Sequence, residues 1–148
     1  MSGTLFALLE RVHGHLALLG LAVLLHPVIT LRTRRGLSWR MQLSADLGAL
    51  LLLVPFALGA WIYPTYRRDV KPSLWVEHHD AALLFETKEH LAAMAVALAV
   101  GGALALRSGG KQPAARQVAW TLLLLGWLCG AGAGVIGLQV AAAAHPGF

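Results

Sequence analysis

Four long apolar runs without a charged side chain constrain the fold of this chain more than any other feature. About 20 helical residues are needed to cross a hydrocarbon core of about 30 Å. The runs are rich in Leu and Ala, which favour helices, and they lack the short alternating segments of a membrane β-barrel. The sequence therefore predicts an all-α integral membrane protein with a single domain over residues 1–148. Its four transmembrane spans contain these runs, two of them with a few residues added at one end, and are predicted over about residues 12–31, 45–63, 88–106 and 118–144.

Composition excludes several other classes of protein. Hydrophobic residues make up 57% of the chain and charged residues 13%, whereas soluble domains contain about 25% charged residues. This balance excludes a water-soluble monomer, and it also excludes a disordered chain, which would contain few hydrophobic residues. The single cysteine, Cys129, cannot form an internal disulfide or a thiolate-rich metal site. Any chemistry therefore depends on other side chains.

The charged residues between the spans predict an orientation. The two short links and the span ends beside them contain one acid, Asp46, and seven basic residues: Arg32, Arg34, Arg35, Arg40, Arg107, Lys111 and Arg116. Basic residues are concentrated in cytoplasmic loops, so we expect an up-down-up-down four-helix bundle with both termini on the outer side of the inner (cytoplasmic) membrane. The lipid bilayer is then the main partner. The net charge of +5 is explained by topology and gives no evidence for nucleic-acid binding.

The long outer link between the second and third spans is also predicted to be helical. Pro72 and Ser73 are residues typical of a helix start. We expect an outer helical extension over about residues 73–87, which continues into the third span without a break.

Histidines supply the main candidates for chemistry. His15 lies 17 residues outward from Arg32 on the first span, and His90 lies 17 residues outward from Arg107 on the third. At about 1.5 Å per residue, both histidines lie about 25 Å from the inner boundary, at one depth and near the outer boundary. His13 is about 200° around the helix from His15, so only one of these two can face the bundle interior. The matching depths favour His15 and His90 as a pair across the bundle.

Small side chains follow this pair on the two faces that are predicted to point inward. The same alignment places Ala22 opposite Ala97 and His26 opposite Gly101. Small residues beside a histidine pair leave room for a flat ring, and haem is a flat cofactor that takes two imidazole ligands.

In His15, His90 and these small residues, the chain resembles the transmembrane b-type cytochromes. The resemblance implies a haem b near the outer face, with the two histidines as axial metal ligands and a role in passing electrons between quinol and an outer partner. It departs from the two-haem pattern because His26 faces glycine, so His26 would be a hydrogen-bond donor or a ligand of a second cofactor. Glu86, one turn outward of His90, is a candidate to accept the second N–H of that imidazole. Such a protein is an electron-transfer component of a respiratory chain rather than a stand-alone enzyme.

A second reading places a non-haem metal or a quinone at the outer boundary. Glu10-x-x-His13 and Glu86-x-x-Glu89-His90 have the spacing that puts a carboxylate and an imidazole on one helix face. His13 faces away from His15, so this site and the haem site cannot form together.

A third reading requires no cofactor. The fourth span contains Gly126-x-x-x-Gly130 and Gly130-x-x-x-Gly134, which are patterns that let two helix backbones approach closely. A glycine-rich span of this kind indicates tight packing against a neighbouring helix or docking of a protein partner. The chain would then be a packing or assembly subunit of a larger membrane complex.

Overall fold

The computed structural model describes residues 3–33 and 36–144, and the regular elements in these ranges are all α-helices. The helices are α1 (Gly3–Thr33), α2 (Trp39–Asp69), α3 (Lys71–Glu77), α4 (His79–Gly109) and α5 (Pro113–Ala144). All but α3 are long and apolar enough to cross a membrane. The predictions of an all-α chain and of four membrane-length helices are therefore confirmed.

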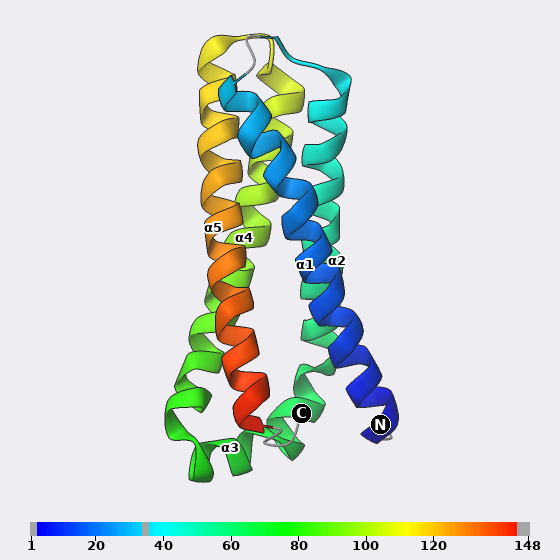
Figure 1. Ribbon diagram of the computed structural model, residues 1–148, viewed down its shortest axis with the longest axis vertical. Coiled ribbons are helices and arrows are strands. Elements are labelled where there is room, and N and C mark those ends of the chain that lie inside the picture. The colour runs from blue at the N-terminus through cyan, green and yellow to red at the C-terminus, as the bar shows by residue number, and fades with distance from the viewer. Residues whose placement is uncertain (1–2, 34–35, 145–148) are drawn as a thin grey trace.

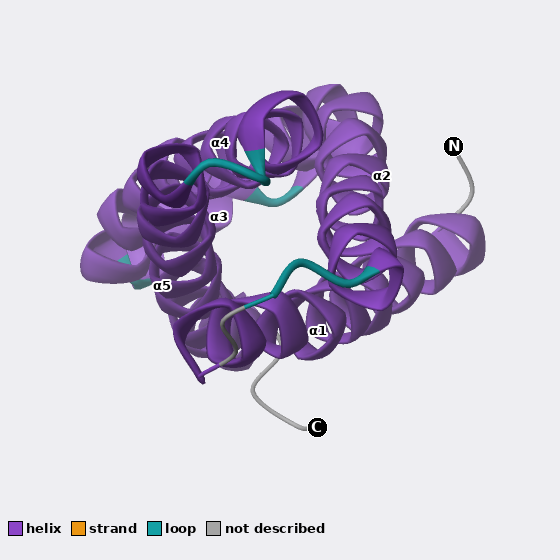
Figure 2. Cartoon of the chain, turned by 90° about the horizontal axis from the view of Figure 1, so that it is seen from above, coloured by secondary structure: helices purple, strands orange, loops and turns teal. Residues whose placement is uncertain are grey.

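The four long helices form a ring. Figure 1 shows α1 beginning and α5 ending at one end of the bundle, which we call the terminal end. The α1–α2 and α4–α5 links lie at the opposite end, which we call the linker end. Around the ring, α1 packs against α2 and α5, and α4 packs against the same two helices (Figure 2). Helices α1 and α4 are therefore diagonal neighbours, with any shared site between them inside the ring.

The long helices extend beyond the predicted spans, at both ends in α1, α2 and α4 and at the start in α5. An uncharged run marks only the part of a helix that is suited to hydrocarbon, whereas charged residues are accommodated in helix ends near water. Helix α2 shows this at its start, where the hydroxyl of Ser38 caps the helix by accepting a hydrogen bond from the backbone N–H of Met41 at 3.3 Å.

The link between α2 and α4 differs from the continuous extension expected over residues 73–87. It is helical, but α3 ends at Glu77, and His78 breaks the path with φ −140° and ψ 63°. The bend lets α3 fold back onto α2 and α4. As a result Leu74 is only 2% exposed and packs in a cluster with Tyr66. A straight extension would carry Leu74 away from this cluster.

The main core lies toward the linker end and is built from leucines and small residues. Leu24, Ala99, Leu106 and Leu123 are fully buried there. The core is thin because the backbones approach closely. A Cβ added at Gly20 would lie 3.0 Å from the carbonyl oxygen of Leu51.

Polar bonds join helices that are not consecutive in the chain. The indole N–H groups of Trp120 and Trp127 on α5 donate to the carbonyl oxygens of Val28 and Leu21 on α1, each at 3.1 Å. On the other side of the ring, the guanidinium of Arg107 on α4 makes two hydrogen bonds of 2.9 Å to the carboxylate of Asp46 on α2. These contacts fix how the α1–α2 pair sits against the α4–α5 pair.

Candidate functional site

The two histidines predicted as haem ligands lie on the surface of the described chain. His15 and His90 are both exposed. Each ring bonds within its own helix, with Nδ1 of His15 at 2.7 Å from the carbonyl of Arg11 and Nδ1 of His90 at 2.8 Å from the carbonyl of Glu86. Exposed faces of diagonal helices point apart, so the structure does not bring these rings together.

The small residues assigned to the same faces are also on the outside. Ala22, His26 and Ala97 are exposed, and Gly101 is half-buried, where an added Cβ would lie 3.7 Å from Cδ1 of Leu122. The carboxylate of Glu86 forms an ion pair with Lys71 at 2.9 Å, whereas the His90 ring bonds to the backbone carbonyl of Glu86.

The rotation of α1 explains this outcome. Leu24, Pro27 and Leu31 are buried and set its inward face. His13 lies on that side of the helix, and His15 lies on the other. Only one of the two histidines faces inward, as the helical spacing predicted. That histidine is His13 and not His15.

His13 is half-buried and reaches across to α2. Its Nδ1 lies 2.8 Å from the carbonyl oxygen of Pro55. A Cβ added at Gly59 would lie 3.1 Å from Cε1 of His13, so the glycine makes room for the ring. With Nδ1 engaged as a donor to Pro55, Nε2 is the acceptor of the neutral imidazole and remains available to a ligand.

Lys88 is the counterpart of His13 on α4. Both residues lie 19 positions outward from the inner arginines, Arg32 and Arg107, so they share one depth. The alkyl chain of Lys88 packs over Gly137 of α5, where an added Cβ would be 3.4 Å from Cε. His13 and Lys88 each lie two residues further out than His15 and His90, so they are aligned in depth in the same way. Their side chains are less exposed than those of His15 and His90.

These residues belong to a group of ionisable side chains that we call the polar cluster, and its members are Glu10, His13, Tyr66, Lys88 and Glu89. The charges of Glu10 and Glu89 act on Lys88 and on Tyr66, and the charge of Lys88 acts on His13. The cluster thus joins residues from α1, α2 and α4. Three of its members, His13, Lys88 and Glu89, fall inside the predicted spans, where ionisable residues are costly and are usually functional.

Tyr66, like Lys88, is a member of the cluster that no sequence pattern singles out. It is only 6% exposed, and its ring stacks on Phe85 with centroids 4.1 Å apart. Its hydroxyl is buried and has no hydrogen-bond partner among the described residues. A buried hydroxyl left without a partner costs roughly 1–3 kcal/mol, so this group is ready to bond to a ligand. In the sequence, Tyr66 lies near the end of an apolar run, where tyrosines are common at the membrane–water interface.

The remaining histidines add no metal centre. His78 and His79 are exposed beside Asp80, and the His79 ring packs edge-on against Trp75, with centroids 4.4 Å apart. His145 lies outside the described residues. Within residues 3–33 and 36–144, no three His, Cys, Asp or Glu side chains are grouped so that they could hold a metal ion.

Comparison with known proteins gives no match. No family model fits the chain, and neither a curated protein nor a solved structure is significantly similar to it. The function must therefore be argued from the residues themselves.

Proposed function

We propose that the four long helices cross the inner membrane in up-down-up-down order, with both termini outside. The basic residues gathered at the linker end support a cytoplasmic position for that end. On this orientation the polar cluster lies about 28 Å from the inner arginines, because 19 residues rise about 1.5 Å each. The polar cluster is then near the outer boundary of the bilayer, within reach of ligands dissolved in the lipid.

We further propose that the polar cluster binds the head group of a lipid-soluble quinone or quinol. The observation that supports this proposal is the buried hydroxyl of Tyr66. It lies in a group of ionisable side chains and has no hydrogen-bond partner among the described residues. A quinone oxygen accepts hydrogen bonds, and Tyr66 and Lys88 carry donors. A quinol hydroxyl donates, and Nε2 of His13 or a carboxylate of the cluster can accept. The chain would then serve as an electron-transfer component at the quinone pool.

Binding of decylubiquinone to the detergent-purified protein, followed by quenching of tryptophan fluorescence, tests this proposal. We expect Tyr66→Phe and His13→Ala each to weaken binding about tenfold, which corresponds to one lost hydrogen bond to a buried polar group. His15→Ala is the matched control, because it removes an exposed imidazole two residues away. Equal binding by wild type, Tyr66→Phe and His13→Ala would refute the proposal.

The haem b predicted between His15 and His90 stays a prediction with a separate test. Both rings would have to turn inward, which requires α1 and α4 to rotate from the described arrangement. Optical spectra of oxidised and reduced protein, expressed with ample haem, decide the matter. Split α and β bands that disappear in both His15→Ala and His90→Ala would support the haem, whereas colourless protein would exclude it.

A cofactor-free assembly role is a second candidate, and the outer face of α5 favours it. Gly126 and Gly130 are already used inside the bundle against α4 and α1, but nothing lies within 4 Å of a Cβ added at Gly134. Val135 and Leu138 beside it are 58% and 75% exposed. We propose this face as the site for any protein partner. Gly134→Trp should reduce the native size of the complex on blue native gels if such a partner binds, with no change if it does not.

A further inference from the structure

Two tryptophans lie far apart on the same outward-facing side of α2. Trp39 is 69% exposed and Trp61 is 70% exposed. Trp61 follows Trp39 by 22 positions in one continuous helix, so the two lie about 33 Å apart along its axis and within about 40° around it. A bilayer has a hydrocarbon core about 30 Å thick. The two indole rings therefore have the spacing of the two boundaries of a bilayer.

The exposed surface of α2 changes in character at these two tryptophans. Within residues 41–60 the exposed side chains are all apolar, and they are Leu43, Leu47, Leu50, Leu53, Val54, Phe56, Ala57 and Ala60. Beyond the second tryptophan they include Arg67, Arg68 and Asp69. Beside the first, the guanidinium of the exposed Arg40 lies 5.8 Å from the centre of the Trp39 ring. The apolar surface thus ends at tryptophans, which are enriched at membrane–water interfaces, and charged residues follow them.

A contact between α1 and α2 transfers these two levels to α1. Gly59 of α2 packs against the ring of His13, because a Cβ added at the glycine would lie 3.1 Å from Cε1. Gly59 precedes one tryptophan by two residues and follows the other by 20. Since α1 runs antiparallel to α2 (Figure 1), the same steps from His13 end at Arg11 and at Thr33. The predicted first span, residues 12–31, lies between these two positions.

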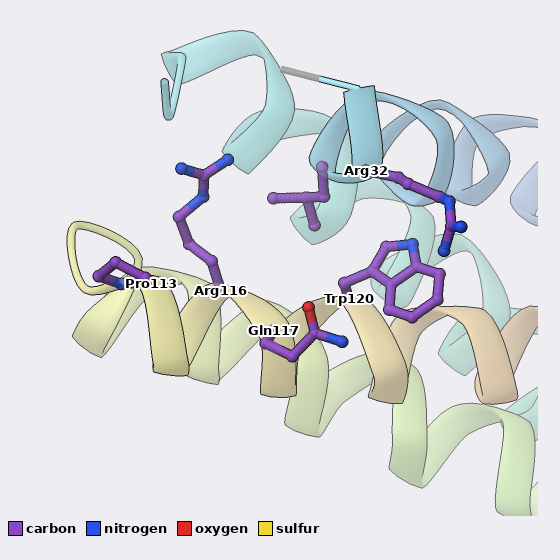
Figure 3. Close-up of a pocket in the computed structure, with 6 residues that line it drawn as sticks. Arg32, Pro113, Arg116, Gln117 and Trp120 are labelled. Atoms are coloured by element: carbon purple, nitrogen blue, oxygen red, sulfur yellow. The ribbon is translucent and has the colours of Figure 1, made fainter. Parts of the chain in front are cut away.

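Arginine and tryptophan also meet at the linker-end level on α1 and α5. Arg32 is exposed one residue from that level, and its guanidinium lies 5.3 Å from the centre of the Trp120 ring (Figure 3). Trp120 is held there because its indole N–H donates to the carbonyl oxygen of Val28 at 3.1 Å. Guanidinium groups match the phosphates of lipid head groups, and their alkyl stems pack on apolar surface. The exposed arginines at this end, Arg32 and Arg40, therefore complement the charge of a head-group layer.

We propose that Trp39 and Trp61 anchor the bundle in the bilayer, each with its ring among the ester groups that lie between the acyl chains and the head groups. The hydrocarbon core then meets α2 along its exposed apolar face. Because Lys88 shares the depth of His13, α3 and the first two turns of α4 stand outside the hydrocarbon core, and the polar cluster lies across its boundary. These positions depend on the spacing of the rings and not on sidedness, so the proposal is independent of the quinone site.

Fluorescence quenching in liposomes of brominated phosphatidylcholine measures the depth of each ring. One lipid carries bromine beside the ester groups, and the other carries it near the end of the acyl chain. The emission of Trp39 or Trp61 is obtained as the difference between wild type and Trp39→Phe or Trp61→Phe. We expect a shallow-to-deep quenching ratio above one for each of the two rings.

Leu50→Trp is the matched control, because Leu50 is 52% exposed, lies midway between the two tryptophans and is on the same side of α2. The emission that this substitution adds should give a ratio below one, since its ring lies about 16 Å from either boundary. A ratio of one or less at Trp39 or Trp61, absence of quenching by both lipids, or the same ratio at all three positions would overturn the proposal. Both tryptophans are exposed, so neither phenylalanine variant disturbs the packing of the bundle.

Discussion

The effect of a glycine in this bundle depends on what lies opposite its Cα. Gly126 faces the α4 backbone, where an added Cβ would be 3.1 Å from both the carbonyl oxygen of Ala95 and the N of Ala99. Backbone atoms cannot move aside as the end of a flexible side chain can. Gly134, two turns along the same helix, faces open space. The two glycines therefore have different roles although both belong to the same repeated pattern.

Gly126→Val should destabilise the folded bundle by about 2 kcal/mol, as expected for overpacking of a close interface. Gly134→Val should change stability by no more than about 0.5 kcal/mol, as expected for an open surface position. Unfolding of the purified protein in mixed micelles with increasing SDS measures both free energies. Similar losses for the two variants would mean that Gly134 is also packed in the folded protein.

Single residues also show what the sequence could and could not predict of the site. Helical geometry correctly predicted that His13 and His15 could not both face inward, because that depends only on spacing. It could not say which of them does, since the rotation of α1 is set by the burial of Leu24 and Pro27 against the rest of the bundle. The polar cluster was partly visible in Glu10-x-x-His13. Tyr66 could not be predicted as a member, because its hydroxyl becomes buried without a hydrogen-bond partner only when the chain folds.

At the scale of elements, hydrogen bonds and ion pairs determine how the helices are placed against one another. The apolar surfaces of these helices are too uniform to do so. Helix α3 is a good example, because Lys71 at its start forms an ion pair with Glu86 of α4 at 2.9 Å. The break at His78 could not be read from the sequence, because residues 73–87 suit one straight helix as well as two. Burial of Leu74 decided between them.

The Lys71–Glu86 pair predicts a response to alkaline pH. The hydrogen bond to Glu86 raises the pKa of Lys71 above its ordinary value of 10.5. Because this pKa is raised, the ion pair contributes fully to the docking of α3 when the pH is below the ordinary pKa of lysine. The contribution is lost as the pH rises through the pKa of Lys71 in the folded protein. The emission difference between wild type and Trp75→Phe should therefore stay constant from about pH 7 to 10 and change only above that range. In a Lys71→Met background, the same difference should show no such change.

The tryptophans of α5 predict a second result at this scale. Trp127→Phe keeps an aromatic ring but removes the hydrogen bond to the carbonyl of Leu21. Hydrogen bonds between membrane helices contribute about 0.6 kcal/mol on average and up to about 1.7 kcal/mol. We expect a loss in that range in the same SDS unfolding assay. Trp61→Phe, at a position that is 70% exposed, should cause no comparable loss.

The whole molecule is a ring of four helices with apolar outer faces and different chemistry at its two ends. Its class and the number of membrane-length helices could be predicted because they depend on composition and run length. Its interior could not, because the inward face of each helix is fixed jointly by all its neighbours.

Cysteine accessibility in intact cells tests the proposed sidedness. In a Cys129→Ala background, Val76→Cys on α3 should react with a membrane-impermeant maleimide, because this position is 83% exposed and lies at the end that we propose to be outside. Lys111→Cys, which is exposed in the α4–α5 link, should react only after the cells are opened. The reverse pattern would invert the bundle and place the polar cluster at the cytoplasmic face.

The pairing of helices has a consequence for how the protein is made. The most extensive packing joins α1 to α2 and α4 to α5, so each pair is a helical hairpin made of consecutive segments. Close contacts at Gly20 and Gly126 lie within the hairpins, whereas the indole and arginine bonds lie between them. A ribosome feeding this chain into a membrane can thus release one finished hairpin before the second is synthesised. Two separately encoded halves, divided after Val70, should assemble in the membrane into the native protein.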